Sequence, residues 1–382
     1  MGDTVLELLP EGMGDAFKEF MEDLTKQGIV ASVGLYGSWC RRVATPSSDV
    51  DLLVLDMRNL EYEYNEFVDY DGLRVDVRRI PVGWVDRVVK PTVDHEVMES
   101  IILYDPQNIL TRGKEWLSGV YWRPSRIKVR AENGLSELNK YISRASSAVE
   151  YDDVESAAVY VRLSVEAVAK AVCELARMVP TNTSLMSKFY KSCYELGVEK
   201  LYDVCVQLAG LVEVNRRKAN HTLNVFRETW EQLSSYVEEN GEIVESLDRK
   251  VRASVDYASS RCFGEGSALR AGEMIQVEDY EEATYYLMRN TAKIVESYAW
   301  IASKKLGMTM NYPHMMTILR TGGGESEDVY ENVLTIFSIQ DVDKQAVKED
   351  IKTLVSASRY IKAHENELLE RGLTLIRDSD KG

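Results

Sequence analysis

Residues 31–56 read ASVGLYGSWCRRVATPSSDVDLLVLD, and this stretch decides the fold of the N-terminal part of the chain. An apolar run ends at Gly37-Ser38, and a polar turn leads to a second apolar run at residues 52–55. Both runs are short, rich in Val and Leu, and bounded by Gly, Pro and Ser. This pattern predicts two strands joined by a turn.

Two aspartates open the second run. In Asp49-Val50-Asp51 the carboxylates are two residues apart, and on a strand residues i and i+2 lie on one face. Parallel carboxylates repel each other unless a cation lies between them, and Mg²⁺ takes one or two carboxylates together with phosphate oxygens. Gly37-Ser38 offers backbone N–H groups with no Cβ in the way, and a hydroxyl, which suits a phosphate.

The spacing of these residues resembles the signature of the DNA-polymerase-β-like nucleotidyltransferase superfamily. Small members of that superfamily read GS..R....P.SD.DL. The matching residues here are Gly37-Ser38, Arg41, Pro46, Ser48-Asp49 and Asp51-Leu52. Arg42 departs from the pattern, since many members have glycine after the arginine. A lone DxD would favour two ordinary exposed aspartates, but the whole constellation favours the superfamily. The resemblance covers the first third of the chain.

The resemblance implies in-line transfer of a nucleoside monophosphate from an NTP, above all AMP from ATP, with release of pyrophosphate. The acceptor would be a hydroxyl of a small molecule or protein. Two Mg²⁺ ions, with Mn²⁺ as an alternative, would be held by Asp49, Asp51 and a third acid on a neighbouring strand. The Gly-Ser pair would hold the β- and γ-phosphates, and an arginine would reach them from the turn. The nucleotide-binding set is Gly37, Ser38, Arg41, Arg42 and Ser48.

The candidate for the third acid is Asp76. Residues 61–69 are followed by Asp71-Gly72 and LRVDVRRIP, and Asp-Gly between alternating segments predicts a β-hairpin. In the second arm the charged side chains share one face, with Asp76 between Arg74 and Arg78. A solvated edge strand with alternating charges is the alternative. We favour the catalytic and metal-binding role, because that face is expected to carry the first two carboxylates.

The composition describes an ordinary soluble protein, with 45% hydrophobic and 28% charged residues. No apolar run approaches a membrane span, and the N-terminus lacks the basic segment of a secretory signal. Five cysteines without a CxxC pair argue against a disulfide framework and a zinc site. We therefore expect a cytoplasmic protein without membrane association. A homo-oligomer is left open.

The net charge of −16 bears on the partners. A protein that grips a long nucleic acid neutralises phosphates with Lys and Arg, so this charge disfavours nucleic acid and an RNA nucleotidyltransferase. A rival of another class is a nucleotide-binding regulatory or antitoxin-like protein with a nucleotidyltransferase fold. Three carboxylates at workable positions favour the enzyme.

The remainder of the chain is predicted to be helical. We expect an α+β protein with a small mixed-sheet palm domain at 1–122, a helical bundle at 123–262, and a second bundle or its continuation at 263–382. Residues 151–170 and 277–296 share an acidic start and aromatic positions, which indicates either two related bundles or the general likeness of amphipathic helices. Arg216 and His221 fit the loose R-x4-H pattern of HEPN ribonucleases, although a plain basic surface is favoured.

Overall fold

The computed structural model describes residues 13–45, 48–58, 60–322 and 326–379, so Pro46 of the motif lies outside the described residues. The chain forms two compact units. The sheet unit comprises Met1–Arg123 and Leu247–Leu269, and the helical unit comprises Pro124–Ser246 and Arg270–Gly382. A small mixed sheet followed by many helices, with 67% of the chain helical, confirms the predicted α+β class.

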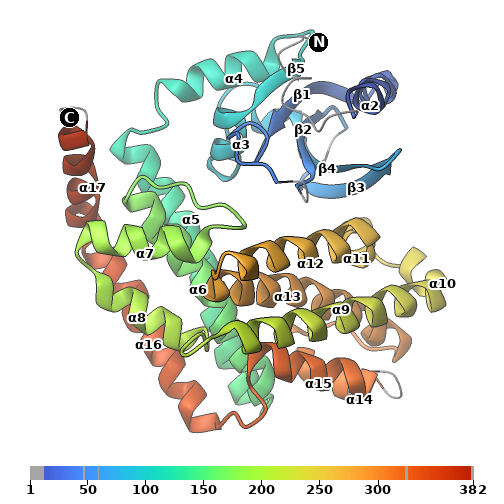
Figure 1. Cartoon of the computed structure of the whole chain (residues 1–382), viewed down its shortest axis with the longest axis vertical. Coiled ribbons are helices and arrows are strands. Elements are labelled where there is room, and N and C mark those ends of the chain that lie inside the picture. Colours follow the sequence, from blue (N-terminus) through green and yellow to red (C-terminus); the bar gives the residue numbers. More distant parts are fainter. Residues whose placement is uncertain (1–12, 46–47, 59, 323–325, 380–382) are drawn as a thin grey trace. The chain divides into compact units, whose positions relative to one another are not determined.

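The sheet unit is built on five strands in the order β3-β4-β2-β1-β5 (Figure 1). Only β2 and β4 are parallel; the other neighbours in the sheet are antiparallel. In the β3–β4 hairpin, Asp71 and Gly72 both have positive φ, at 53° and 80°, which is the geometry of a type I′ turn. The strands are β1 Val30–Tyr36, β2 Val50–Asp56, β3 Tyr64–Tyr70, β4 Leu73–Pro81 and β5 Ile101–Tyr104.

Each face of this sheet has its own apolar core. Helix α2 (Gly14–Lys26) buries Phe17 and Phe20 against the side chains of Leu52 and Val75. The other face packs Leu53 and its neighbours against residues of the two helices that follow β4, which are α3 (Asp94–Glu99) and α4 (Ile109–Ser118). The short 3-10 segments η1 (Val82–Trp84) and η2 (Pro91–Val93) connect β4 to α3.

A later segment of the chain also belongs to the sheet unit. Helix α11 (Arg249–Ser259) packs on β3, and the Tyr257 ring lies 5.6 Å from the Phe67 ring, centroid to centroid. Helix α12 (Arg261–Gln276) begins in this unit and runs without a break through residues 262 and 263, where the sequence analysis divides the helical part. The sheet unit is therefore discontinuous in sequence.

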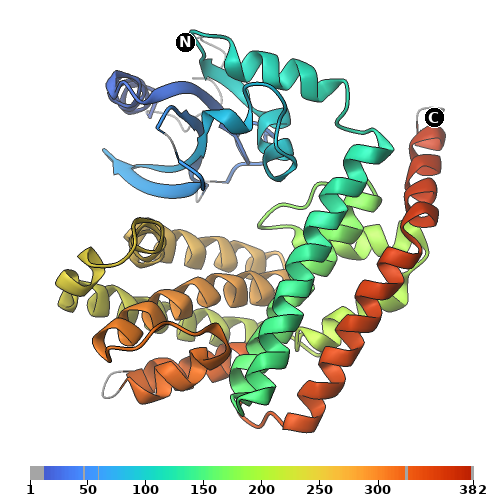
Figure 2. The same cartoon turned by 180° about the vertical axis from the view of Figure 1, so that it is seen from behind.

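The helical unit is built around the long hairpin of α5 (Pro124–Glu150) and α6 (Val154–Leu175), with α16 (Lys344–Ala363) packed on both (Figure 2). Helix α9 (Arg216–Glu239) packs on α13 (Tyr280–Lys305). Arg216 and His221 lie near the start of α9, where both are exposed. The remaining elements are α7 Leu185–Leu196, α8 Glu199–Leu208, α10 Gly241–Glu245, η3 Tyr312–His314, α14 Met315–Thr321, α15 Ser326–Phe337 and α17 Glu365–Ser379.

The two segments of similar sequence make reciprocal contacts. At the start of α6, Ser156 and Asp153 accept the backbone N–H groups of Met316 and Thr317 at 2.8 and 3.0 Å, which caps α14. At the corresponding place in α13, Glu282 accepts three backbone N–H groups at the start of α7, at 2.8 to 3.2 Å. Each first helix thus caps the second helix of the other segment, so the two similar segments pack together within the one helical unit.

Candidate nucleotidyl-transfer site

Asp49 and Asp51 lie at the start of the central strand of the sheet unit. Asp49 directly precedes β2 and is 4% exposed. Asp51 lies in β2, where its register partners are Tyr36 of β1 and Asp76 of β4. Because β2 and β4 are parallel, the side chains of the partners Asp51 and Asp76 leave the same face of the sheet. The structure therefore brings two of the three candidate carboxylates side by side.

The alternation of β2 decides which face carries the acids. Val50 and Leu52 pack in the core beneath α2, so Asp51 points to the opposite face, together with Leu53. That face is covered further along by α3 and α4. The acids therefore lie where the covered part of this face ends.

Asp76 is held by two neighbours. It is 8% exposed; its Oδ1 accepts a hydrogen bond from the Asn65 amide and its Oδ2 one from the Tyr257 hydroxyl, both at 3.3 Å. Asn65 is only 11 positions away, but Tyr257 is 181 positions away and comes from α11. Nothing in the local sequence around Asp76 identifies Tyr257, so sequence analysis missed it.

Gly37 occupies a position that only glycine can take. Its φ is +80°, and a Cβ built there would lie 1.9 Å from Oδ2 of Asp51. The backbone of the Gly-Ser turn thus passes directly against one of the candidate carboxylates, and a side chain would displace it. The Trp39 indole donates to the carbonyl of Asp49 at 2.9 Å, which ties the same turn to the start of β2.

In the structure, the predicted nucleotide-binding residues make hydrogen bonds within the sheet unit. Arg41 donates to both carboxylate oxygens of Glu99 at 2.9 and 2.7 Å, and Gly37 N–H donates to the same Glu99 at 3.0 Å. The carbonyl of Ser38 accepts the Val43 N–H. The Ser48 hydroxyl accepts from the backbone N–H of Thr45 at 2.9 Å, so it closes the loop before β2.

Arg42 is exposed and has φ +57°, in the left-handed region that favours glycine. This conformation gives a physical reason for the glycine that the resembling sequences carry here. We expect Arg42→Gly to raise the free energy of unfolding by up to about 1 kcal/mol, since relief of the strained backbone outweighs the added entropy of the unfolded chain. Urea denaturation measures it, with Arg112→Gly in helix α4 as the control that should destabilise. A loss of stability in Arg42→Gly would contradict this prediction.

The acids also act on Tyr36. Burial, and then the charges of Asp51 and Asp76, raise the pKa of the Tyr36 phenol well above its ordinary value. The phenol therefore stays protonated at neutral pH. On the α3 side of the same face, Arg78 pairs with Glu96 and, at 2.7 Å, with Glu63.

The carboxylates of the candidate site suit a hard cation that takes only one or two ligands from the protein. Among the described residues, no three Asp, Glu, His or Cys side chains gather closely enough to enclose a metal ion. Asp51 and Asp76 nevertheless present carboxylates side by side from adjacent strands. Mg²⁺ commonly takes one or two carboxylates and completes its shell with water and substrate phosphates, so the residues present fit it.

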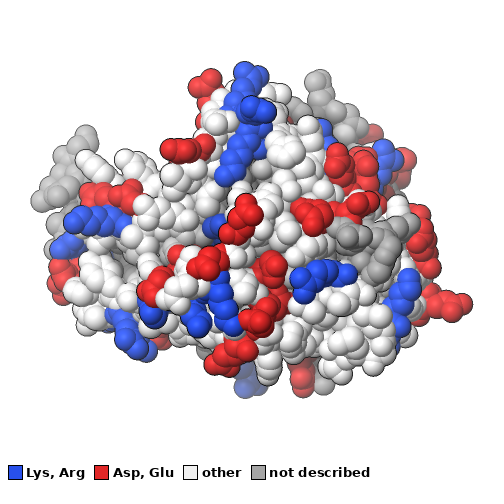
Figure 3. Space-filling model, turned by 90° about the horizontal axis from the view of Figure 1, so that it is seen from below, with Lys and Arg blue, Asp and Glu red and all other residues white. Residues whose placement is uncertain are grey.

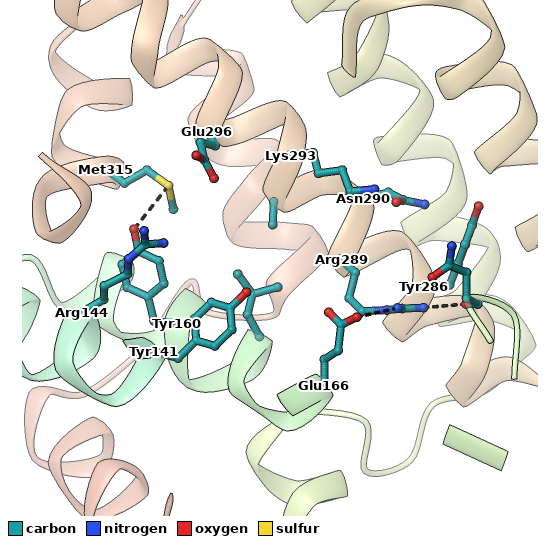
Figure 4. Close-up of a pocket in the computed structure, with 13 residues that line it drawn as sticks. Tyr141, Arg144, Tyr160, Glu166, Tyr286, Arg289, Asn290, Lys293, Glu296 and Met315 are labelled. Carbon is teal, nitrogen blue, oxygen red and sulfur yellow. Dashed lines mark hydrogen bonds and ion pairs between the residues drawn. The ribbon is translucent and has the colours of Figure 1, made fainter. Parts of the chain in front are cut away.

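A pocket of about 190 Å³ lies in the helical unit, and none of its lining residues belongs to the motif (Figure 4). Tyr160 of α6 and Tyr286 of α13, which occupy equivalent positions in the two similar segments, both line it. Glu166 and Arg289, which also line it, form an ion pair with 3.1 Å between Oε1 and Nη1. The pocket thus lies between the two helices that share a sequence pattern.

A match to a protein family supports the assignment of the sheet unit. The profile of the nucleotidyltransferase domain family matches residues 15–104. No curated protein matches the chain. A nucleotidyltransferase-like protein from Exiguobacterium sibiricum 255-15, known from its crystal structure, is 16% identical, with a TM-score of 0.31. The similarity covers 50% of this chain and 66% of that protein, just under two thirds of its length. Residues 15–104 therefore carry a nucleotidyltransferase domain, in agreement with the superfamily resemblance of the Gly-Ser and Asp-x-Asp motif within them.

Proposed function

We propose that this protein transfers a nucleoside monophosphate, AMP from ATP, to a hydroxyl of a small molecule or protein and releases pyrophosphate. The observation that carries the proposal is the register of Asp51 and Asp76 on adjacent parallel strands, beside a Gly37 backbone that approaches Asp51 too closely for any side chain. Such a site combines carboxylates for a metal with a backbone N–H donor for a phosphate chain.

In this proposal Asp49 and Asp51 hold Mg²⁺, and Asp76 shares a second ion. Bound there, Mg²⁺ would neutralise the charge of the triphosphate and lower the pKa of the attacking hydroxyl. Gly37 N–H and the Arg41 guanidinium bind phosphate oxygens and orient the triphosphate for in-line attack. Tyr257 and Asn65 hold the Asp76 carboxylate in one orientation through their hydrogen bonds.

The direct test follows the label. The full chain is incubated with Mg²⁺, a cell extract and ATP labelled at the α- or the γ-phosphate. We expect acid-stable label on an acceptor only from α-labelled ATP, together with pyrophosphate. Label transferred only from the γ-phosphate would indicate a kinase, and ATP that is bound but neither transferred nor hydrolysed would favour the nucleotide-binding regulator.

Asp76→Asn tests the division of labour among the acids. Asp76 is proposed to act at the attacking hydroxyl, so its contribution belongs to the transition state. We expect Mg·ATP affinity within a few-fold of wild type and transfer reduced by roughly two to four orders of magnitude. Asp71→Asn is the control, because it removes the same charge from the tip of the same hairpin and Asn tolerates the positive φ found there. Loss of ATP binding in Asp76→Asn would assign Asp76 to the nucleotide instead.

Charge argues against RNA as the acceptor. The chain carries a net charge of −16, and Figure 3 shows Asp and Glu side chains interspersed among Lys and Arg on the face it presents. We expect no salt-resistant binding to tRNA at physiological ionic strength, measured by filter binding over a salt series. Tight binding with a steep salt slope would revive the RNA nucleotidyltransferase. No helix in the described ranges is both long and apolar enough to cross a membrane.

A further inference from the structure

Glu99 occupies the groups that the proposed function assigns to the triphosphate. It is the last residue of α3, and its carboxylate accepts a hydrogen bond from Gly37 N–H at 3.0 Å. The same carboxylate accepts two more from the Arg41 guanidinium, at 2.9 and 2.7 Å. One anionic side chain therefore engages both the backbone donor of the Gly-Ser turn and the arginine of the motif.

No local geometry requires this contact. Glu99 is separated from Gly37 by 62 positions and from Arg41 by 58, and it reaches the turn from a different element. Carboxylate and phosphate oxygens recognise the same donors, namely backbone N–H groups in a concave turn and a guanidinium fork. The three bonds thus mark this turn as an anion site, and Glu99 as an anion already placed in it.

We propose that Glu99 is an internal competitor of the nucleotide triphosphate. This inference rests on the proposed function, since it takes the Gly37 and Arg41 groups as the phosphate site. In the free protein Glu99 neutralises Arg41 and occupies Gly37 N–H, and ATP binding requires its carboxylate to leave both. The side chain of Glu99 is 23% exposed and that of Arg41 33%, so the pair lies at the surface, where the carboxylate can turn to water.

Competition between Glu99 and the triphosphate sets the apparent affinity of the protein for ATP. A ligand that binds only the open site has its dissociation constant raised by the reciprocal of the open fraction. A partly exposed, charge-assisted pair keeps the site closed in most molecules, and we expect its removal to tighten binding of the triphosphate about five- to tenfold. The increase in affinity applies to a triphosphate chain, because the chain binds both Gly37 N–H and Arg41. Adenosine has no phosphate, so its affinity should not change.

Glu99→Gln tests the inference, because the amide keeps the shape of the side chain and removes its charge. The full chain is titrated with Mg·ATP, with inorganic tripolyphosphate plus Mg²⁺, and with adenosine, by isothermal calorimetry. We expect Glu99→Gln to bind Mg·ATP and tripolyphosphate five- to tenfold more tightly than wild type. Glu115→Gln, which removes an exposed charge from α4 of the same unit, should leave all three affinities unchanged.

The alternative role for Glu99 is to orient Arg41 for the phosphate, and it predicts the opposite sign. Weaker Mg·ATP binding in Glu99→Gln would overturn the competitor and make Glu99 a positioning residue. Equal binding in wild type and Glu99→Gln would also overturn it, while the proposed function would stand. An absence of Mg·ATP and tripolyphosphate binding in every variant would overturn the proposed function and, with it, the phosphate site that Glu99 is inferred to occupy.

Discussion

Asp51→Asn should abolish nucleotidyl transfer and leave the sheet unit folded. Asp51 is the acid that links two parts of the candidate site: it is the register partner of Asp76 and lies against the Gly37 backbone. Replacing its carboxylate with an amide removes the charge that would hold the metal of the triphosphate. We expect transfer to fall by roughly three orders of magnitude or more, and Mg·ATP affinity to fall with it.

The stability of the same variant separates a functional acid from a structural one. Asp51 and Asp76 are like charges side by side, so Asp51→Asn should melt at the same temperature as wild type or slightly higher. Asp56, at the other end of β2, is completely buried and pairs with Arg58 at 2.5 Å and Arg79 at 3.7 Å. Asp56→Asn should therefore lower the melting temperature.

Two measurements check these expectations: label transfer from α-labelled ATP and thermal melting followed by circular dichroism. Asp71→Asn again serves as the variant that removes a charge without touching the site. Normal turnover in Asp51→Asn would contradict the metal assignment. A melting temperature lowered as far as that of Asp56→Asn would show that Asp51 is a structural acid.

Glu166→Ala should destabilise the helical unit by about 3 kcal/mol, the cost of leaving one member of a buried ion pair without its partner. Glu166 pairs with Arg289 at 3.1 Å and with Lys170 at 2.8 Å, and the Arg289 side chain is only 9% exposed. Without Glu166, the Arg289 guanidinium retains its hydrogen bond to the carbonyl of Asn182 at 2.6 Å but loses the carboxylate that pairs with it directly.

Two further variants at this ion pair make the prediction specific. The other partner of Glu166 is Lys170, and the Lys170 side chain is 54% exposed. Lys170→Ala should therefore lower the free energy of unfolding by less than about 1 kcal/mol. Glu166→Leu/Arg289→Met removes both charges and should recover much of the stability lost in Glu166→Ala. Urea midpoints measure all three. A cost of Glu166→Ala no larger than that of Lys170→Ala would show that the pair contributes no more than a surface salt bridge.

The same pair predicts a pH dependence. Burial acts to raise the pKa of Glu166, but the charges of Lys170 and Arg289 outweigh it and hold that pKa far below its ordinary range. A carboxyl whose pKa is lower in the folded than in the unfolded state stabilises the fold above the unfolded pKa, which is about 4.3. This contribution is therefore complete at neutral pH and is lost as the pH falls below about 4. Glu166→Gln should flatten the dependence in that range.

The sequence alone determined the features that depend on local spacing. The short apolar runs bounded by turn residues predicted β1 and β2, Asp-Gly predicted the β3–β4 turn, and the period of two predicted which face of β4 carries Asp76. These features follow from backbone geometry, since a strand alternates its side chains wherever it lies and a type I′ turn requires residues that tolerate positive φ. The family motif falls in the same class, because its residues lie close together in sequence.

Only the tertiary structure decided the contacts made across long stretches of chain. Tyr257 reaches Asp76 over 181 positions, Glu99 reaches Gly37 over 62, and Glu282 caps the helix that begins at Leu185 over 97. Such contacts depend on which surfaces pack together, and any exposed tyrosine or glutamate has the same local sequence character as these. Hydrophobic periodicity indicates which face of a helix is buried but not which element covers it. The packing of α11 on the sheet unit and the binding of Glu99 to the Gly-Ser turn are therefore seen only in the folded chain.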